Sequence, residues 1–192
     1  FRACDLHYRD DGMQKACLHA IGHLCYDHEK NRRIAEQLRA VSIVAKSITT
    51  HPRKTDVQTA GCYALAMMCH HSELLQHEAL EREMPTEADY EKEKQKLMRK
   101  TKMKGGAGGS SGGAGGEDII LMGGVITLPP GKFICLDPVI NAMASHIRSR
   151  DLVLFGIVAL NNICGADGQH QMGIIEVEGH IAIRLAMQAH LN

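Results

Sequence analysis

The amino-acid sequence predicts an all-α fold built from a repeated helical unit. The first observation is self-similarity, because the segment Met13–Cys25 returns 44 residues later and again 139 residues later. The second is apolar spacing of i, i+3, i+4 and i+7 within each copy, which is typical of one face of an α-helix. One such unit cannot bury both of its apolar faces, so we expect the copies to stack side by side.

Composition fits a folded chain of one or two domains. The 192 residues are 44% hydrophobic and 23% charged, which is enough for one or two cores. Lys+Arg and Asp+Glu both total 22, so no overall basic field attracts nucleic acid, and we expect no nucleic-acid partner. No apolar run approaches the roughly 20 residues that span a bilayer, so we expect no membrane partner.

The compartment follows from the same features. Seven cysteines, an odd number, lie mostly within helical patterns, which favours reduced, buried thiols over a disulfide framework. With no signal-peptide pattern at the start, we expect the cytoplasm, with the nucleus as the alternative. Because the sequence begins at Phe1 with no Met, we expect a piece of a longer protein.

The elements follow in order along the chain. The segment Phe1–His7 matches the end of a unit, and the long helix then appears three times. Between the first two copies the matched positions are Met13/Val57, Gln14/Gln58, Ala16/Ala60, Ala20/Ala64, Ile21/Leu65, Leu24/Met68 and Cys25/Cys69. In the third copy the residues that match Leu18, Ala20, Ile21, Leu24 and Cys25 are Ile157, Ala159, Leu160, Ile163 and Cys164.

A second apolar helix also repeats and always ends in histidine. Its copies are "VAKSITTH", "VINAMASH" and "IRLAMQAH", and with "FRACDLH" they place His7, His51, His146 and His190 at separations of 44, 95 and 44 residues. A histidine at a helix C-terminus can hydrogen-bond the last carbonyl groups. We therefore expect each of these histidines to cap its own helix rather than to bind a metal.

The segments "IAEQLRAVSIVAKSI" and "DVQTAGCYALAMMC", joined through "HPRKT", resemble the armadillo repeat. The resemblance covers residues 1–80 and 118–192, and the period of 44 is in the armadillo range. It implies a right-handed α-solenoid of about three repeats plus a partial one, whose third helices line a groove for a peptide or protein. The candidate groove residues are Lys46, Thr50, Asn141, Ser145, Arg184 and Gln188. Armadillo proteins that bind nuclear-localisation peptides have a Trp and Asn ladder, whereas this chain has no Trp.

Residues 81–117 match no repeat and are predicted to be an insertion. Thr86 and Asp89 are spaced as a capping box at the start of a helix. Acidic residues gather at the beginning of the following segment and basic residues at its end, which suits the helix dipole, so we predict a charged helix over 87–104. The following Gly, Ala and Ser run over 105–116 predicts a flexible coil. It lacks the Lys-Ser/Thr of a phosphate-binding loop.

A metal site is the main alternative to a scaffold. His19 and His23 lie four residues apart on one helix, flanked by Cys17 and Cys25, and zinc accepts both ligand types. The other copies have Tyr63 and Met67, then Val158 and Asn162, in place of the two histidines. The repeat therefore favours packing or surface histidines, while Cys25 matches the core positions Cys69 and Cys164.

No Ser-His-Asp order, HExxH or CxxC motif is present, so the sequence predicts a non-enzymatic protein without a cofactor. We expect a scaffold that binds a protein or an extended peptide along the solenoid surface, as part of a larger signalling or assembly protein. The alternatives are a His/Cys metal-binding protein with its site on the Cys17–Cys25 helix, and a purely structural repeat segment.

Overall fold

The computed structural model describes residues 2–83, 132–165 and 168–190. Within them the regular structure is helical apart from one isolated bridge between Arg82 and Phe133, so the all-α prediction is confirmed for this part of the chain. The chain divides into one compact unit of Phe1–Arg82 with Phe133–Asn192 and another of Glu83–Lys132. The charged helix, the glycine-rich run and the repeat segment predicted over 118–131 lie outside the described residues.

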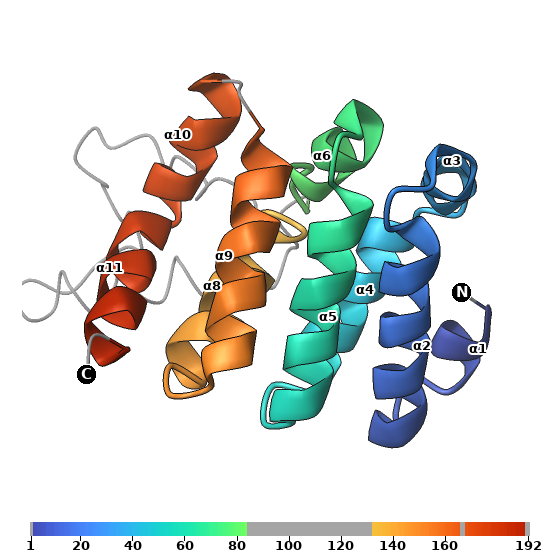
Figure 1. The fold of residues 1–192 in the computed structure, drawn as a ribbon, viewed down its shortest axis with the longest axis horizontal. Coiled ribbons are helices and arrows are strands. Elements are labelled where there is room, and N and C mark those ends of the chain that lie inside the picture. The colour runs from blue at the N-terminus through green and yellow to red at the C-terminus, as the bar shows by residue number, and fades with distance from the viewer. Residues whose placement is uncertain (1, 84–131, 166–167, 191–192) are drawn as a thin grey trace, which may run out of the picture. The chain divides into compact units, whose positions relative to one another are not determined.

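The three copies of the long helix lie side by side in one layer (Figure 1). They are α2 (Asp11–Cys25), α5 (Thr55–Met68) and α9 (Arg150–Cys164). We call this the first layer. Its helices begin at residues that are equivalent by the repeat, so the three copies predicted from the sequence are helices.

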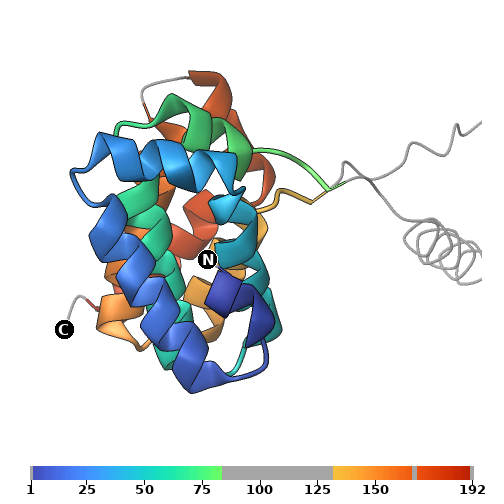
Figure 2. The ribbon, with the colours of Figure 1, turned by 90° about the vertical axis from the view of Figure 1, so that its right-hand side faces the viewer.

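A second layer runs behind the first (Figures 1 and 2). It consists of α1 (Arg2–Leu6), α4 (Ala40–Thr50), α8 (Leu136–Ser145) and α11 (Gly179–Ala189). Three short helices lie along one edge of the two layers: α3 (Glu29–Gln37), α6 (Glu73–Ala79) and α10 (Gly168–Glu176).

Local contacts set where the helices begin and end. The Asp10 carboxylate accepts a hydrogen bond from the Met13 amide at 2.9 Å and caps α2. The residue before α4, Arg39, is left-handed with φ 52° and provides no side-chain cap. The buried Glu78 of α6 accepts from the Ser42 amide at 3.1 Å instead, so α4 is capped from another helix.

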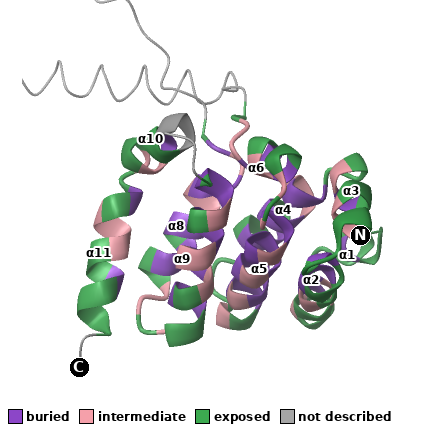
Figure 3. Ribbon diagram, turned by 45° about the horizontal axis from the view of Figure 1, so that its top comes forward, coloured by how far each residue is buried: buried purple, intermediate pink, exposed green. Residues whose placement is uncertain are grey.

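The core lies between the layers and repeats with the helices (Figure 3). The equivalent residues Ile21, Leu65 and Leu160 are buried, as are Cys25, Cys69 and Cys164. All seven cysteines are thiols rather than disulfides, and six of them are buried. Burial was predicted for these thiols, and Cys17, which is half-buried, is the exception.

Close approach between the layers depends on glycine. A Cβ on Gly61 of α5 would lie less than 3 Å from Ile48 of α4, and one on Gly156 of α9 would lie 2.6 Å from Met143 of α8. The two contacts are equivalent by the repeat, so both positions require a small residue. Cys17 occupies the same position in α2.

The prediction that the apolar face is buried is wrong for part of the first copy, α2. Ala16, Ala20 and Leu24 are exposed on α2, whereas their counterparts Ala60, Ala64 and Met68 are buried on α5. The α5 residues are covered because α2 packs beside that helix. No described helix covers the same face of α2, so its apolar spacing does not produce burial.

None of the helices that the structure describes has the length and apolar character to cross a bilayer.

Candidate binding surfaces

The histidines at the ends of the second-layer helices form a regular series of hydrogen bonds. His51 Nε2 lies 2.7 Å from the carbonyl oxygen of Tyr8, His146 Nε2 lies 2.8 Å from that of Pro52, and His190 Nε2 lies 2.8 Å from that of Ile147. Each acceptor directly follows the last histidine of the preceding copy. A carbonyl only accepts, so Nε2 donates in all three. We call this the histidine series.

The prediction that these histidines cap their own helices is therefore wrong. They bind the turn of the neighbouring copy instead, and at the end of α4 the last carbonyl groups already have another donor. Gln58 Nε2 donates to the carbonyls of Ile48 and His51 at 2.6 and 2.9 Å, and Gln14 makes the equivalent bonds to Cys4 and His7. Both glutamines are buried. The sequence does contain a sign of these glutamine bonds, namely a glutamine that recurs at the same position of an otherwise apolar helix.

The first layer has a row of rings across its three helices. The ring centroids of His19 and Tyr63 are 5.8 Å apart, those of His23 and Tyr63 are 5.2 Å apart, and Phe155 meets Tyr63 edge-on at 5.1 Å. The Tyr63 hydroxyl lies 3.0 Å from His23 Nδ1. We call His19, His23, Tyr63 and Phe155 the ring row. His19, Tyr63 and Phe155 are half-buried and His23 is exposed, so the row stands at the surface.

The four candidate metal ligands do not form one cluster. No group of three or more His, Cys, Asp or Glu side chains suited to a metal occurs among the residues with a described position. Cys25 is buried, and burial raises the pKa of its thiol. Burial, His23 and Lys15 lower the pKa of His19. The two histidines contact Tyr63 instead of the two cysteines.

The six predicted groove residues all lie on the second layer, away from the ring row. Lys46 and Thr50 are on α4, Asn141 and Ser145 are on α8, and Arg184 and Gln188 are on α11, all exposed. Lys46 Nζ lies 2.9 Å from Asp5 Oδ1 of α1, and this ion pair raises the pKa of Lys46.

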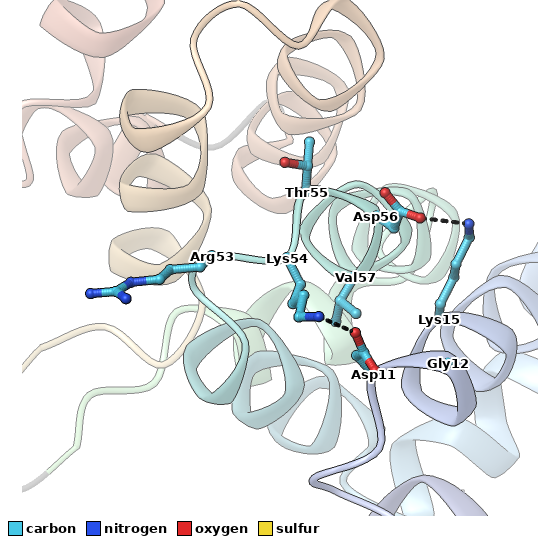
Figure 4. A pocket seen from close by; sticks show the side chains of 8 residues that line it. All are labelled: Asp11, Gly12, Lys15, Arg53, Lys54, Thr55, Asp56 and Val57. Carbon is cyan, nitrogen blue, oxygen red and sulfur yellow. Dashed lines mark hydrogen bonds and ion pairs between the residues drawn. The ribbon is translucent and has the colours of Figure 1, made fainter.

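A polar pocket of about 430 Å³ lies where α2 and α5 begin (Figure 4). Its lysines are paired across the two helices, Lys54 with Asp11 at 2.6 Å and Lys15 with Asp56 at 2.8 Å. The hydrogen bond and charge of Lys54 lower the pKa of Asp11. Arg53 extends away from both ion pairs (Figure 4). Since the two lysines are already engaged by carboxylates, the pocket offers little net charge to an anion.

Comparisons with protein-family models, with curated proteins and with solved structures gave no match to this chain. The argument about function therefore depends on the geometry above.

Proposed function

We propose that this chain is an armadillo-like right-handed α-solenoid that acts as a non-enzymatic scaffold and binds a protein or an extended peptide. The repeat supports the architecture, because the same contact returns at equivalent positions in successive copies. Examples are Ile48 on Gly61 and Met143 on Gly156, and the three bonds of the histidine series. The proposal includes no catalytic residue and no cofactor.

The ring row is the observation that favours binding, and it favours the first layer over the predicted groove. Aromatic side chains give large contact areas at a low cost in conformational entropy and are enriched at protein interfaces. Here they lie half-buried across three helices, with Tyr63 between His23 and Phe155. The groove residues of the second layer are polar or charged and include no aromatic residue, and Lys46 is already paired with Asp5.

The half-buried rings are also held in position before any partner binds. Tyr63 packs against Gly22, where an added Cβ would lie 2.5 Å from the Tyr63 ring, and its hydroxyl is bonded to His23. Asn162 Nδ2 donates to the Ala66 carbonyl at 2.8 Å and ties α9 to α5. A preorganised surface loses little entropy when it binds.

The test is selection from a displayed library of unstructured peptides, followed by calorimetry with a selected peptide. We expect Phe155→Ala with Tyr63→Leu to weaken binding at least tenfold, roughly 1.4 kcal/mol. The matched control is Lys46→Ala with Arg184→Ala on the second layer, which should leave binding unchanged. Circular dichroism verifies that each variant keeps its helices.

Other outcomes support the alternatives. Loss of binding in the second-layer variant alone would assign the site to the predicted groove. A library that gives no binder would favour the purely structural repeat segment. Stoichiometric zinc by elemental analysis, lost on replacing His19 and His23, would favour the metal-binding protein.

The proposed compartment is the cytoplasm or the nucleus, where the seven thiols would stay reduced.

A further inference from the structure

The turns before the three first-layer helices each have an arginine at the same position. Arg9, Arg53 and Arg148 all lie two residues after a histidine that is equivalent by the repeat, and all three are exposed. The turns lie along the edge where α2, α5 and α9 begin, opposite the edge of α3, α6 and α10 (Figure 1). We call these three residues the arginine row. The repeat therefore places one guanidinium group per copy on a single edge.

The three turns share one backbone hydrogen bond. In each of them the amide that follows the arginine donates to the carbonyl of the histidine. The pairs are Asp10 to His7 at 3.0 Å, Lys54 to His51 at 3.0 Å and Ser149 to His146 at 2.8 Å. Each arginine is thus the third residue of a hydrogen-bonded turn, and the three side chains leave the chain at equivalent points.

The next copy holds each turn in place. The residue just before each arginine is the acceptor of one bond of the histidine series. His146, for example, donates from Nε2 to the Pro52 carbonyl, so its Nδ1 accepts from the Thr55 hydroxyl at 3.1 Å. The backbone beside Arg53 is therefore fixed before any partner binds, and only the arginine side chains become ordered on binding.

The charge of the row is not neutralised within the described residues. Neither Arg53 nor Arg148 forms an ion pair there, and Arg9 lies over the ring of Tyr8, 5.2 Å from its centroid. The two lysines of the pocket where α2 and α5 begin differ, since both are paired with aspartates. Arg53 extends away from those pairs (Figure 4). The row therefore offers positive charge to a partner.

A second pocket on this edge, of about 490 Å³, lies beside the turn before α9. It is lined by Thr55, Ser145, His146, Ile147, Arg148 and Ser149. None of these residues is acidic, whereas Asp11 and Asp56 line the first pocket. The Ser149 side chain makes no capping bond to α9. With hydroxyl groups and a guanidinium but no carboxylate, this pocket suits an anionic group.

We propose that the arginine row binds an acidic segment of a partner protein in the polyproline II conformation, with a carboxylate at every third residue. Neighbouring packed helices lie about 8–10 Å apart, so the arginines of successive copies are separated by a similar distance. Polyproline II has three residues per turn and rises about 3.1 Å per residue, so every third side chain lies on one face at intervals of about 9 Å. The two spacings match, and arginine forms bidentate pairs with carboxylates.

A protein segment fits this edge better than a nucleic acid. Asp10 and Asp151 are exposed beside the row and would repel a strand that has a phosphate at every nucleotide. A segment with separated carboxylates can place uncharged residues there instead. The site is also distinct from the ring row, whose residues lie further along the first-layer helices, so the two binding surfaces can be tested independently.

The probe is a fluorophore-labelled synthetic peptide of four Glu-Pro-Pro repeats, in which proline favours the polyproline II conformation. Fluorescence anisotropy with the full chain at low ionic strength, where charges are least screened, should show saturable binding. Replacing every glutamate of the peptide by glutamine should abolish it. A peptide of the same composition with its four glutamates consecutive should bind at least threefold more weakly, since it reaches fewer arginines at once.

Variants of the chain locate the site. Arg53→Gln and Arg148→Gln should each weaken binding at least threefold, and the double variant at least tenfold. The matched control is Arg184→Gln, which removes an exposed arginine of α11 and should leave binding unchanged. Tyr63→Leu with Phe155→Ala should also leave it unchanged, which separates this site from the ring row. Circular dichroism verifies that each variant keeps its helices.

Absence of saturable binding, or equal binding of the glutamine peptide, would overturn the proposal. Equal weakening by Arg184→Gln and Arg53→Gln would show general charge attraction without a site. Equal binding of the peptide with consecutive glutamates would contradict the match in spacing. A single-stranded oligothymidylate that binds more tightly than the peptide, and loses that binding in the double arginine variant, would assign the row to nucleic acid instead.

Discussion

The imidazole of His146 lies 2.8 Å from the carbonyl oxygen of Pro52, the residue that directly follows the terminal histidine of the preceding copy. His51 makes the same bond to Tyr8 and His190 makes it to Ile147. A series of this kind links each copy to the one before it. The copies are thus joined by directed polar bonds as well as by apolar packing.

The histidine series predicts a loss of stability on substitution. His51 is only 8% exposed, so His51→Ala removes a largely buried hydrogen bond and leaves the Tyr8 carbonyl without this donor. We expect a loss of about 1–3 kcal/mol in the free energy of unfolding. Urea unfolding followed by circular dichroism measures it.

The matched control for His51→Ala is His7→Ala. His7 ends the equivalent segment, and its ring makes no such bond among the described residues. Unchanged stability in both variants would show that the series contributes nothing.

The close contact between Gly61 and Ile48 predicts a second loss. An added Cβ would lie less than 3 Å from two Ile48 side-chain atoms, so Gly61→Ala forces α4 and α5 apart. Overpacking of this kind costs about 1–3 kcal/mol. We expect Ile48→Val to recover part of that loss in a double-mutant cycle, because Cδ1 of Ile48 is one of the close atoms.

Gly12→Ala is the control for the backbone effect of replacing a helical glycine. Its added Cβ would come no nearer than 3.4 Å to another atom, so we expect no loss of stability. Equal effects at Gly12 and Gly61 would contradict the steric explanation.

The sequence alone predicted the helices better than the surfaces. An internal offset fixes which residues are equivalent, so the helices at Asp11, Thr55 and Arg150 could be located. The equivalence of two positions does not show whether another helix packs beside each copy. The sequence therefore did not predict that Leu24 is exposed. Phe155 was missed because it aligns with Ala16 and Ala60, so the repeat gives no sign of an aromatic residue there.

The acceptors of the histidine series were missed for a related reason. The repeat located every terminal histidine, but the direction of a ring depends on which polar groups remain free nearby. Gln58 occupies the carbonyl of His51, and His51 itself turns to Tyr8. Such a choice between partners depends on tertiary packing.

Glu78 predicts a pH dependence of stability. Burial raises the pKa of this carboxyl above its ordinary value of 4.5, while hydrogen bonds from Ser42 and the charge of Arg39 act in the opposite direction. A raised native pKa means that its contribution to stability is fully present below 4.5 and is lost as the pH rises through the native pKa. Since Glu78→Gln cannot titrate, it should gain stability relative to wild type as the pH rises through that window.

Urea unfolding of both proteins from about pH 4 to about pH 8 measures this difference. Glu81→Gln is the control. The hydrogen bond with Arg39 lowers the pKa of Glu81, so its contribution is present above 4.5 and is lost as the pH falls through the native pKa. A constant difference between wild type and Glu78→Gln across the range would show that burial of Glu78 has no such effect.

The thiols predict a selective chemical modification. Six cysteines are buried, and burial raises the pKa of Cys62 to about 12 and that of Cys164 to about 11. The thiolate is the reactive form, so these six should react slowly in the native protein.

Cys17 is half-buried and should provide the one thiol that reacts quickly with a thiol-specific disulfide reagent. We expect Cys17→Ser to abolish the fast phase and Cys164→Ser to preserve it, with the six buried thiols reacting only in denaturant. A fast phase that persists in Cys17→Ser would mean that the helices around another cysteine open readily.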